Sequence, residues 1–157
     1  MLTKEHVGIR RLTDEVFEEF ASAIADNGIS VDNSISDSLS IKGNSTLLYA
    51  LFRNLVENSI RYGGNGITIS LSCSESDGKA CFSYSDSGKG VSLEHIDRIF
   101  ERFYRIPSED AHRAEGSGLG LSIVRNAVAF HGGTISASPV SPSSPHGLRF
   151  RFDIPKL

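Results

Sequence analysis

The chain has 157 residues, 39% of them hydrophobic and 22% charged, which is the size and balance of one compact globular domain with a sizeable core. Its formal net charge of −3, with no long block of lysines or arginines, argues against nucleic acid or an anionic membrane as the main partner. No segment approaches the ~20 apolar residues that span a membrane, and residues 1–11 lack the apolar core of a signal peptide. These properties predict a soluble, cytosolic domain.

The first half of the chain predicts two helices separated by short strands. Apolar residues at three- and four-residue spacing predict a helix over residues 12–25, which the following Asn-Gly pair ends. Loose alternation over residues 29–41 predicts short, half-buried strands. Asn44 fits the N-cap of a second helix, which contains the stretch LFRNLVENSIRYGG at residues 51–64.

Two strand candidates, residues 67–73 and 79–85, are joined by a polar turn and predict an antiparallel hairpin. Cys73 and Cys81 lie on either side of this turn, so a cross-strand disulfide is conceivable in an oxidising compartment. The alternative is a pair of small, partly buried thiols in a reduced cytosol. The sequence has no Cys-x-x-Cys pair and no cluster of histidines and cysteines, so we expect no structural zinc site.

The second half of the chain alternates between short elements and loops. Residues 93–104 are short-helical, and residues 105–115 are charged and without period, which predicts a mobile loop. A glycine-rich stretch leads into a helix over residues 121–130, and strands at 134–138 and 148–154 follow. Three long helices and four to six short strands, mostly joined as hairpins, predict an α+β fold. We expect a two-layer α/β sandwich, with the helices on one face of a mixed, mostly antiparallel sheet.

Three glycines at alternate positions, in the stretch GSGLGL at residues 116–121, precede the last predicted helix. Glycine lets the backbone approach a ligand closely, and the free N–H groups at a helix N-terminus attract phosphate. The alternative is a tight loop with no ligand. The dinucleotide-binding and P-loop motifs are both absent, because the spacing is G-x-G-x-G and Lys89 is followed by Gly90 instead of Ser or Thr.

A second glycine pair lies in the stretch DSGKG, residues 86–90, at the end of a predicted strand. A carboxylate fixed at a strand end can accept a hydrogen bond from an exocyclic amine, and the glycines let a flat base pack against the backbone. The same pattern is also common in turns that bind nothing.

The helix that contains residues 51–64 has two distinct faces on a helical projection. The residues expected to face the core are Leu48, Phe52, Leu55, Val56 and Ser59. Asn54, Asn58 and Arg61 fall together on the adjoining arc. The asparagines are either surface or hydrogen-bonded core residues, or they line a site in which amide oxygens suit Mg²⁺ while Arg61 and Tyr62 reach a phosphate.

Four segments in this order, NLVENSIRY, SDSGKGV, IFERFYR and GSGLGLSIV, resemble the N, G1, F and G2 boxes of the sensor histidine kinases. These kinases belong to the ATP-binding group that also includes gyrase, the Hsp90 chaperones and the MutL repair proteins. The resemblance covers residues 12–155. It implies a Bergerat-type ATP-binding sandwich with a mobile lid over the nucleotide, and it implies ATP and Mg²⁺ as cofactors.

The resemblance also implies roles for single residues near the base and the metal. Asp86 is expected to bind the adenine amino group, with Gly88 and Gly90 shaping the adenine pocket. Asn58 is expected to ligate Mg²⁺, with Asn54 beside it in the polar network.

Further roles implied by the resemblance concern the phosphates and the lid. Arg61 and Tyr62 are expected to contact phosphate or lid, and Phe100 and Phe103 to anchor the lid. Arg105 is placed to stabilise charge on the transferring γ-phosphoryl group.

The glycine-rich loop has an implied role as well. Gly116, Gly118 and Gly120 are expected to close on the phosphates, while Leu119 and Leu121 pack the pocket and the core.

The residue at position 54 distinguishes between the branches of the ATP-binding group that this sequence resembles. In the gyrase, Hsp90 and MutL branch this position is typically a glutamate that activates water, whereas Asn54 has an amide, which is not a general base. Hydrolysis is therefore not the expected reaction. In a histidine kinase the nucleophile is an imidazole on another domain, and the ATP-binding domain positions and polarises the nucleotide. Asn54, Arg61 and Arg105 are the residues we expect to serve this transfer.

In the family that this sequence resembles, the histidine that accepts the phosphoryl group lies in a helix and is followed by an acidic residue. The histidines of this chain do not fit that pattern: they are His6, His95, His112, His131 and His146. We therefore expect residues 1–11 to be the tail of a preceding dimerisation and phosphoacceptor region, and residues 12–157 to be the ATP-binding catalytic domain. The expected partners are that dimerisation domain and a response-regulator receiver domain. The expected parent protein is homodimeric, with a membrane anchor as one option.

Two alternatives remain at this point. The first is a degenerate nucleotide-binding module that regulates a partner without transferring phosphate. The second is an anti-sigma-type serine kinase of the same fold, although those relatives prefer an acid where Asn54 stands.

Overall fold

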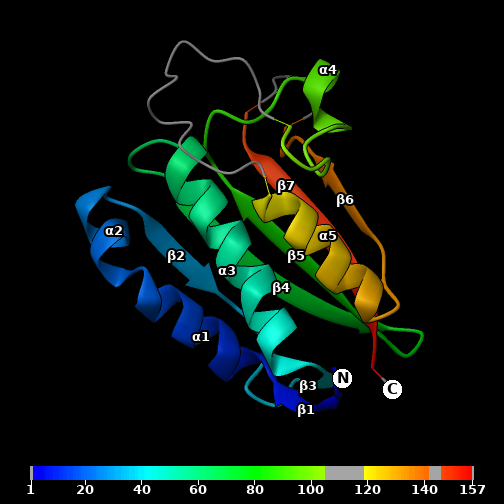
Figure 1. Ribbon diagram of the computed structural model, residues 1–157. Helices are drawn as coiled ribbons and strands as arrows, with labels where there is room; N and C mark the ends of the chain where they lie inside the picture. The colour runs from blue at the N-terminus through cyan, green and yellow to red at the C-terminus, as the bar shows by residue number, and fades with distance from the viewer. Residues whose placement is uncertain (1, 105–118, 142–145, 157) are drawn as a thin grey trace.

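A five-stranded sheet forms one layer of the computed structural model, which describes residues 2–104, 119–141 and 146–156 (Figure 1). Its strands are β2 (Ser30–Asn33), β4 (Thr68–Ser76), β5 (Lys79–Asp86), β6 (Ile135–Ser138) and β7 (Leu148–Pro155). They lie in the order β2-β4-β5-β7-β6, with β2 parallel to β4 and the other pairs antiparallel. The sheet is thus mixed and mostly antiparallel, as predicted.

Three helices cover one face of this sheet (Figure 1). They are α1 (Ile9–Glu19), α3 (Ser45–Tyr62) and α5 (Gly120–Phe130). The Asn44 side chain caps α3 by accepting a hydrogen bond from the backbone N–H of Leu47 at 3.0 Å, which confirms the predicted helix start. Helices on one face of a mixed sheet make the predicted two-layer α+β sandwich.

The N-terminal residues differ from the prediction. β1 (Glu5–Gly8) pairs antiparallel with β3 (Ser40–Gly43) in a second, two-stranded sheet. The first helix begins at Ile9 and is interrupted at Phe20, after which α2 (Ala21–Asp26) follows. Ile9, the first residue of α1, is fully buried, so the helix packs on the core from its start. A strand of four residues gives too short a pattern to be recognised from the sequence.

The core between the two layers is built on the apolar face of α3. All five residues predicted to face the core are buried. The Phe52 ring contacts the rings of Phe82 and Phe152, with centroid separations of 5.7 and 5.9 Å, and the latter two stack at 4.9 Å. This aromatic cluster joins the helix to the two central strands β5 and β7.

The β4–β5 hairpin excludes the cross-strand disulfide. Its turn is Asp77-Gly78, with φ of 53° and 75°, as in the Asp-Gly turns that suit the twist of a hairpin. Cys73 lies opposite the buried Phe82, and Cys81 lies opposite Ser74. Successive side chains alternate between faces, so the two thiols lie on opposite faces of the sheet. Both cysteines are free, and burial raises the pKa of Cys73 to about 11.

His131, directly after α5, is a buried histidine with a structural role. Its Nε2 accepts a hydrogen bond from the backbone N–H of Asn44 at 3.0 Å, and its Nδ1 donates to the carbonyl of Ala127 at 2.7 Å. This pattern requires the neutral ring. Burial lowers the pKa of His131, and the nearby charge of Lys4 lowers it further. The end of α5 is thereby joined to the N-cap of α3.

The pKa of His131 predicts loss of stability in mild acid. Because the pKa is lower in the folded state, the contribution of His131 is complete above about pH 6.5, the unfolded value, and is lost as the pH falls below it. We expect urea titrations to give a smaller free energy of unfolding at pH 5.5 than at pH 7.5. His131→Gln, which cannot ionise, should flatten this dependence. An unchanged pH dependence in the variant would contradict the assignment.

Candidate nucleotide site

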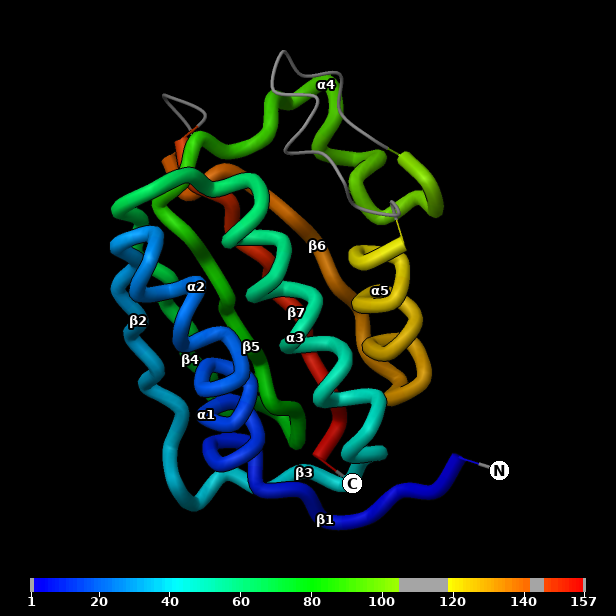
Figure 2. Tube along the Cα trace, turned by 60° about the vertical axis from the view of Figure 1, so that its left-hand side comes forward, coloured from blue at the N-terminus to red at the C-terminus, as the bar shows by residue number. Residues whose placement is uncertain are grey.

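The predicted site residues gather at one end of the molecule. The C-terminal half of α3, the end of β5 and the beginning of α5 lie in the upper part of Figure 2, with α4 (Leu93–Ile96) beyond them. Three predicted site residues, Arg105, Gly116 and Gly118, lie outside the described residues.

Asp86, the last residue of β5, is the buried charge of this site, with 5% of its surface exposed. Its Oδ1 accepts a hydrogen bond from the backbone N–H of Gly88 at 3.0 Å, and its Oδ2 accepts one from the Ser59 hydroxyl at 2.7 Å. Burial raises the pKa of Asp86, and these two hydrogen bonds oppose that rise. An ionised carboxylate has about four acceptor positions, so both oxygens keep capacity for a ligand.

Gly88 makes a contact that no other residue could make. A Cβ at this position would lie 2.6 Å from both the Cα and the carbonyl oxygen of Gly63, which directly follows α3. The loop after β5 therefore packs backbone against backbone on the end of α3, which fixes Asp86 relative to that helix. Gly90 has a φ of 76°, a conformation that favours glycine.

The two asparagines of α3 are both half-buried but are held differently. The Asn54 amide donates to the carbonyl of Ala50 at 2.7 Å. A Cβ on Gly120 would lie 3.1 Å from the Asn54 side-chain oxygen, so Asn54 is at the contact between α3 and α5. Within the described part of the chain, the Asn58 amide has no hydrogen-bond partner. Asn54 is bound to the protein, and Asn58 is available to a ligand.

Arg61 and Tyr62 end α3 next to the asparagines. The Arg61 guanidinium forms an ion pair with Glu57 at 2.9 Å, and Glu57 also contacts Arg53 at 3.2 Å. These side chains are partly exposed, so the pair is weak and Arg61 can leave it at small cost. Tyr62 is exposed.

The two phenylalanines predicted to anchor the lid differ in their surroundings. The Phe100 ring packs edge-on against the core ring of Phe150, with centroids 5.9 Å apart. Phe103 is 66% exposed, has a φ of 64°, and contacts the Arg102 guanidinium instead of the core. Phe103 thus does not pack on the core, and its role as an anchor of the lid stays a prediction, because residues 105–118 lie outside the described residues.

The start of α5 presents a helix N-terminus to the same region. Gly120 is its first residue, and the carbonyl of the preceding Leu119 accepts a hydrogen bond from the Ser122 hydroxyl at 2.7 Å. Leu121 is partly buried against the core, as predicted. Free N–H groups at a helix start are suited to bind an anion such as phosphate.

The sequence analysis missed the contact of Ser59 with Asp86 and the contact of Tyr84 with Ser59. Ser59 was assigned only to the core face of α3, and Tyr84 was not considered. A serine on a buried helix face was the available signal, because buried hydroxyls need hydrogen-bond partners. Its partners could not be identified without the register between helix and strand.

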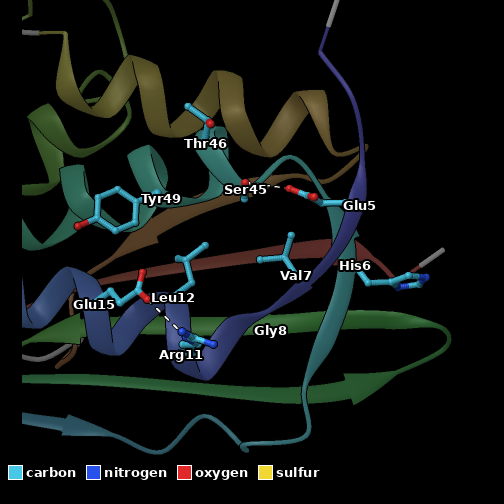
Figure 3. Close-up of a pocket in the computed structure, with 10 residues that line it drawn as sticks. All are labelled: Glu5, His6, Val7, Gly8, Arg11, Leu12, Glu15, Ser45, Thr46 and Tyr49. Carbon is cyan, nitrogen blue, oxygen red and sulfur yellow. Dashed lines mark hydrogen bonds and ion pairs between the residues drawn. The ribbon is translucent and has the colours of Figure 1, made fainter.

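A groove of about 560 Å³ lies at the other end of α3 (Figure 3). It is lined by Glu5, His6, Val7, Gly8, Arg11, Leu12, Glu15, Ser45, Thr46 and Tyr49. Ser45 donates to Glu5 at 3.0 Å, and Arg11 pairs with Glu15 at 3.5 Å, so several of its polar groups are satisfied internally. It contains none of the predicted site residues.

Two features are absent from the described ranges. These ranges contain no group of three or more histidine, cysteine, aspartate or glutamate residues that could hold a metal ion by themselves. Across residues 2–104, 119–141 and 146–156, no helix has the length and apolar character needed to cross a membrane.

A buried carboxylate at a strand end, beside a helix with two asparagines and at the same end of the molecule as a second helix N-terminus, is similar to the arrangement of the Bergerat-type ATP-binding domains. Residues 43–157 match the family of histidine kinase-, DNA gyrase B- and HSP90-like ATPases, and the chain belongs to this family. The resemblance inferred from the four sequence boxes is thereby confirmed.

The curated relatives are sensor kinases. BaeS, a signal transduction histidine-protein kinase of Escherichia coli K12, is 37% identical over 119 residues, which cover 76% of this chain and 26% of BaeS. The sensor histidine kinase CusS of the same organism is 32% identical over 147 residues, which cover 92% of this chain and 30% of CusS. The chain thus spans less than a third of the length of these relatives.

Solved structures agree with the fold. The catalytic domain of histidine kinase ThkA has a TM-score of 0.85 and 26% identity, covering 99% of this chain and 97% of that domain. Full-length ShkA in complex with AMPPNP has a TM-score of 0.82 and 28% identity, covering 99% of this chain and 31% of ShkA. A complex of ThkA with the response regulator protein TrrA also matches, with a TM-score of 0.79 and 25% identity over 98% of this chain and 42% of that one.

The contact between Gly88 and Gly63 predicts a large effect of one methyl group. Gly88→Ala should lower the free energy of unfolding by about 1–3 kcal/mol, because the added Cβ has no space between backbone atoms. Gly8→Ala is the matched control, since nothing lies within 4 Å of a Cβ there and φ is −76°. It should change stability by less than about 0.5 kcal/mol. Equal effects in urea unfolding would refute the packing role of Gly88.

Proposed function

We propose that this chain is the ATP-binding catalytic domain of a two-component sensor histidine kinase. It would position Mg-ATP for phosphoryl transfer to a histidine on a separate dimerisation domain, from which the group passes to an aspartate of a response regulator. The buried and doubly hydrogen-bonded carboxylate of Asp86, in a domain of this family, is the observation that carries the proposal. The AMPPNP complex of ShkA and the regulator complex of ThkA support it.

Base recognition rests on Asp86 in this proposal. The carboxylate accepts a hydrogen bond from the adenine amino group with an acceptor position that Gly88 and Ser59 leave open. The contact between Gly63 and Gly88 fixes the position of that carboxylate relative to the end of α3. No proton is transferred at this point, so Asp86 contributes affinity and orientation.

Asn58 is the proposed protein ligand for Mg²⁺. Its amide has no partner among the described residues, is half-buried, and is a neutral oxygen donor of the kind Mg²⁺ accepts alongside water and substrate phosphates. These properties fit the ion, although one amide is not a complete cage. When bound with ATP, Mg²⁺ would neutralise charge on the phosphates.

The phosphate groups are proposed to lie between α3 and the start of α5. Arg61 would exchange its ion pair with Glu57 for a phosphate oxygen, and the N–H groups that follow Gly120 would point at the same group. Roles for Tyr62 and Phe100 at the edge of the site, and for Arg105, Gly116 and Gly118, rest on the family resemblance alone.

Transfer to histidine instead of water follows from Asn54. Its amide donates to the Ala50 carbonyl and lies against Gly120, and an amide cannot accept a proton from water as a general base can. Water at this position is therefore not activated. The domain would act through positioning and electrostatics.

The acceptor histidine is proposed to lie outside this domain, in a dimerisation region connected before β1. His131 is buried and bonded at both nitrogens, and His95 contacts the Tyr104 hydroxyl and Glu94. These two side chains already have structural partners. A cytoplasmic location, a homodimeric parent protein and a membrane anchor in that protein belong to the same proposal.

The phosphorylation assay uses this chain, γ-labelled ATP with Mg²⁺, and the dimerisation domain of the same protein. We expect label on the added domain that is lost in acid and kept in alkali, since phosphohistidine is acid-labile and phosphoserine is not. Asp86→Asn should lower transfer at limiting ATP by about 10- to 100-fold, through loss of a hydrogen bond to a charged group. Acid-stable label would favour the serine kinase, and binding of ATP without transfer would favour the regulatory module.

The proposed role of Asn58 as a Mg²⁺ ligand predicts that its substitution weakens the binding of Mg-ATP more than the binding of metal-free ADP. Asn58→Ala should weaken Mg-ATP about tenfold, equal to about 1.4 kcal/mol, and change metal-free ADP by less than about twofold. Calorimetric titrations with both ligands measure this difference. Asn126→Ala, which removes an exposed asparagine from α5, is the control and should change neither affinity. Equal losses for both ligands would exclude the metal role.

A further inference from the structure

Two buried hydroxyl groups lie behind Asp86 and connect it to the backbone of α3. The Ser59 hydroxyl is 2.7 Å from Asp86 Oδ2 and 2.9 Å from the Tyr84 hydroxyl, which in turn is 3.2 Å from the carbonyl oxygen of Leu55. Tyr84 is fully buried, and Ser59 and Asp86 are 1% and 5% exposed. We refer to the hydroxyls of Ser59 and Tyr84 as the hydroxyl relay.

The positions of these residues in the fold make the relay rigid. Ser59 lies one turn after Leu55 on the core face of α3, and Tyr84 lies two residues before Asp86 on the same face of β5. The relay therefore crosses from the helix layer to the sheet layer, and it reaches the carboxylate from the side opposite to solvent.

The number of protons on the two hydroxyls determines which group donates in each hydrogen bond of the relay. Each hydroxyl has one proton, and an ionised Asp86 only accepts, so the Ser59 proton points at Asp86 Oδ2. The Ser59 oxygen can then only accept, and its available donor is the Tyr84 hydroxyl. The single Tyr84 proton is then shared between the Ser59 oxygen and the Leu55 carbonyl. A protonated Asp86 would donate to Ser59 and turn both hydroxyls toward the Leu55 carbonyl, so Oδ2 would lose the donor that Ser59 gives it. The hydrogen bond from Ser59 to Oδ2 is thus the contribution of the relay to the ionised carboxylate.

In the surroundings of Asp86, hydrogen bonds are what stabilise the ionised carboxylate. Its neighbours on the adjacent strands are Ile69 and Leu148, which are apolar, and the titratable group packed beside it is Tyr84. Within the described residues Asp86 forms no ion pair. The donors that offset its burial are the backbone N–H of Gly88 and the hydroxyl of Ser59, and only the second is a side chain.

The ionisation and orientation of this carboxylate decide which purine it accepts. The 6-amino group of adenine donates a hydrogen bond to a carboxylate, whereas guanine bound in the same orientation presents at this position an oxygen that an ionised carboxylate repels and that only a protonated carboxyl can bind. We propose that Ser59 and Tyr84 are positioning residues which hold Asp86 for adenine and against guanine. This proposal rests on the nucleotide-binding function proposed above.

The test measures ADP and GDP binding by calorimetry, without metal, from pH 5 to pH 8. Ser59→Ala should weaken ADP about 10-fold at pH 7.5 and leave GDP nearly unchanged, so that the ADP/GDP selectivity falls by the same factor. We call the fall in ADP affinity at low pH, where Asp86 becomes protonated, the acid limb. Ser59→Ala should also move this acid limb to higher pH, because the carboxylate has lost a hydrogen-bond donor. Ser59→Thr retains the hydroxyl and should restore both properties.

Tyr84→Phe keeps the ring in the core and removes one hydroxyl, so it remains informative if Ser59→Ala fails to fold. We expect it to weaken ADP about two- to fivefold and to move the acid limb in the same direction. Because Tyr84 acts through Ser59, the double variant should be no weaker than Ser59→Ala alone. Thr13→Val is the control: it removes a buried hydroxyl on α1, and it should lower thermal stability without changing selectivity.

The possible outcomes separate the two proposals. If the unaltered chain binds no ADP, both fail. If it binds ADP, and folded Ser59→Ala and Tyr84→Phe retain the selectivity and the acid limb of the unaltered chain, the relay is overturned while the proposed function stands. Additive losses in the double variant would overturn the relay order in which Tyr84 acts through Ser59.

Discussion

Burial of the Asp86 carboxylate is the constraint on which the organisation of this site depends. A buried charge is unfavourable unless it is paired or hydrogen-bonded, and each oxygen of Asp86 receives a donor from a different part of the chain. One donor comes from α3 and the other from the loop after β5. Both elements must therefore meet at one point. The burial that makes the carboxylate costly also strengthens any hydrogen bond that a ligand donates to it.

The contact between Gly63 and Gly88 provides the close approach that this arrangement needs. A side chain at Gly88 would separate the loop from the end of α3 and disturb the hydrogen bonds of Asp86. The asparagines of α3 then lie at a fixed distance from the Asp86 end of β5. Asn54 is bound by its own helix and by the start of α5, whereas the Asn58 side chain has no partner among the described residues. Packing thus places two identical side chains in different surroundings.

The elements that were predicted correctly are those whose structure depends on residues close together in the sequence. The core face of α3, its Asn44 cap and the β4–β5 hairpin follow from periodicity and turn chemistry, and the four boxes identified the family. β1 and its pairing with β3 could not be predicted, because a two-stranded sheet between distant segments leaves no local signal. For the same reason the disulfide could not be excluded: the opposite orientation of the thiols depends on strand register. The contact of Ser59 with Asp86 also depends on how helix and strand face each other.

The bonds of His131 have a consequence for the placement of α5. They fasten the C-terminal end of α5 to the N-cap of α3, while the other end of α5 touches α3 through Gly120 and Asn54. Buried residues of α5 lie between these two points. The two helices are therefore in register at both ends of α5, and sliding one along the other would break both sets of contacts at once.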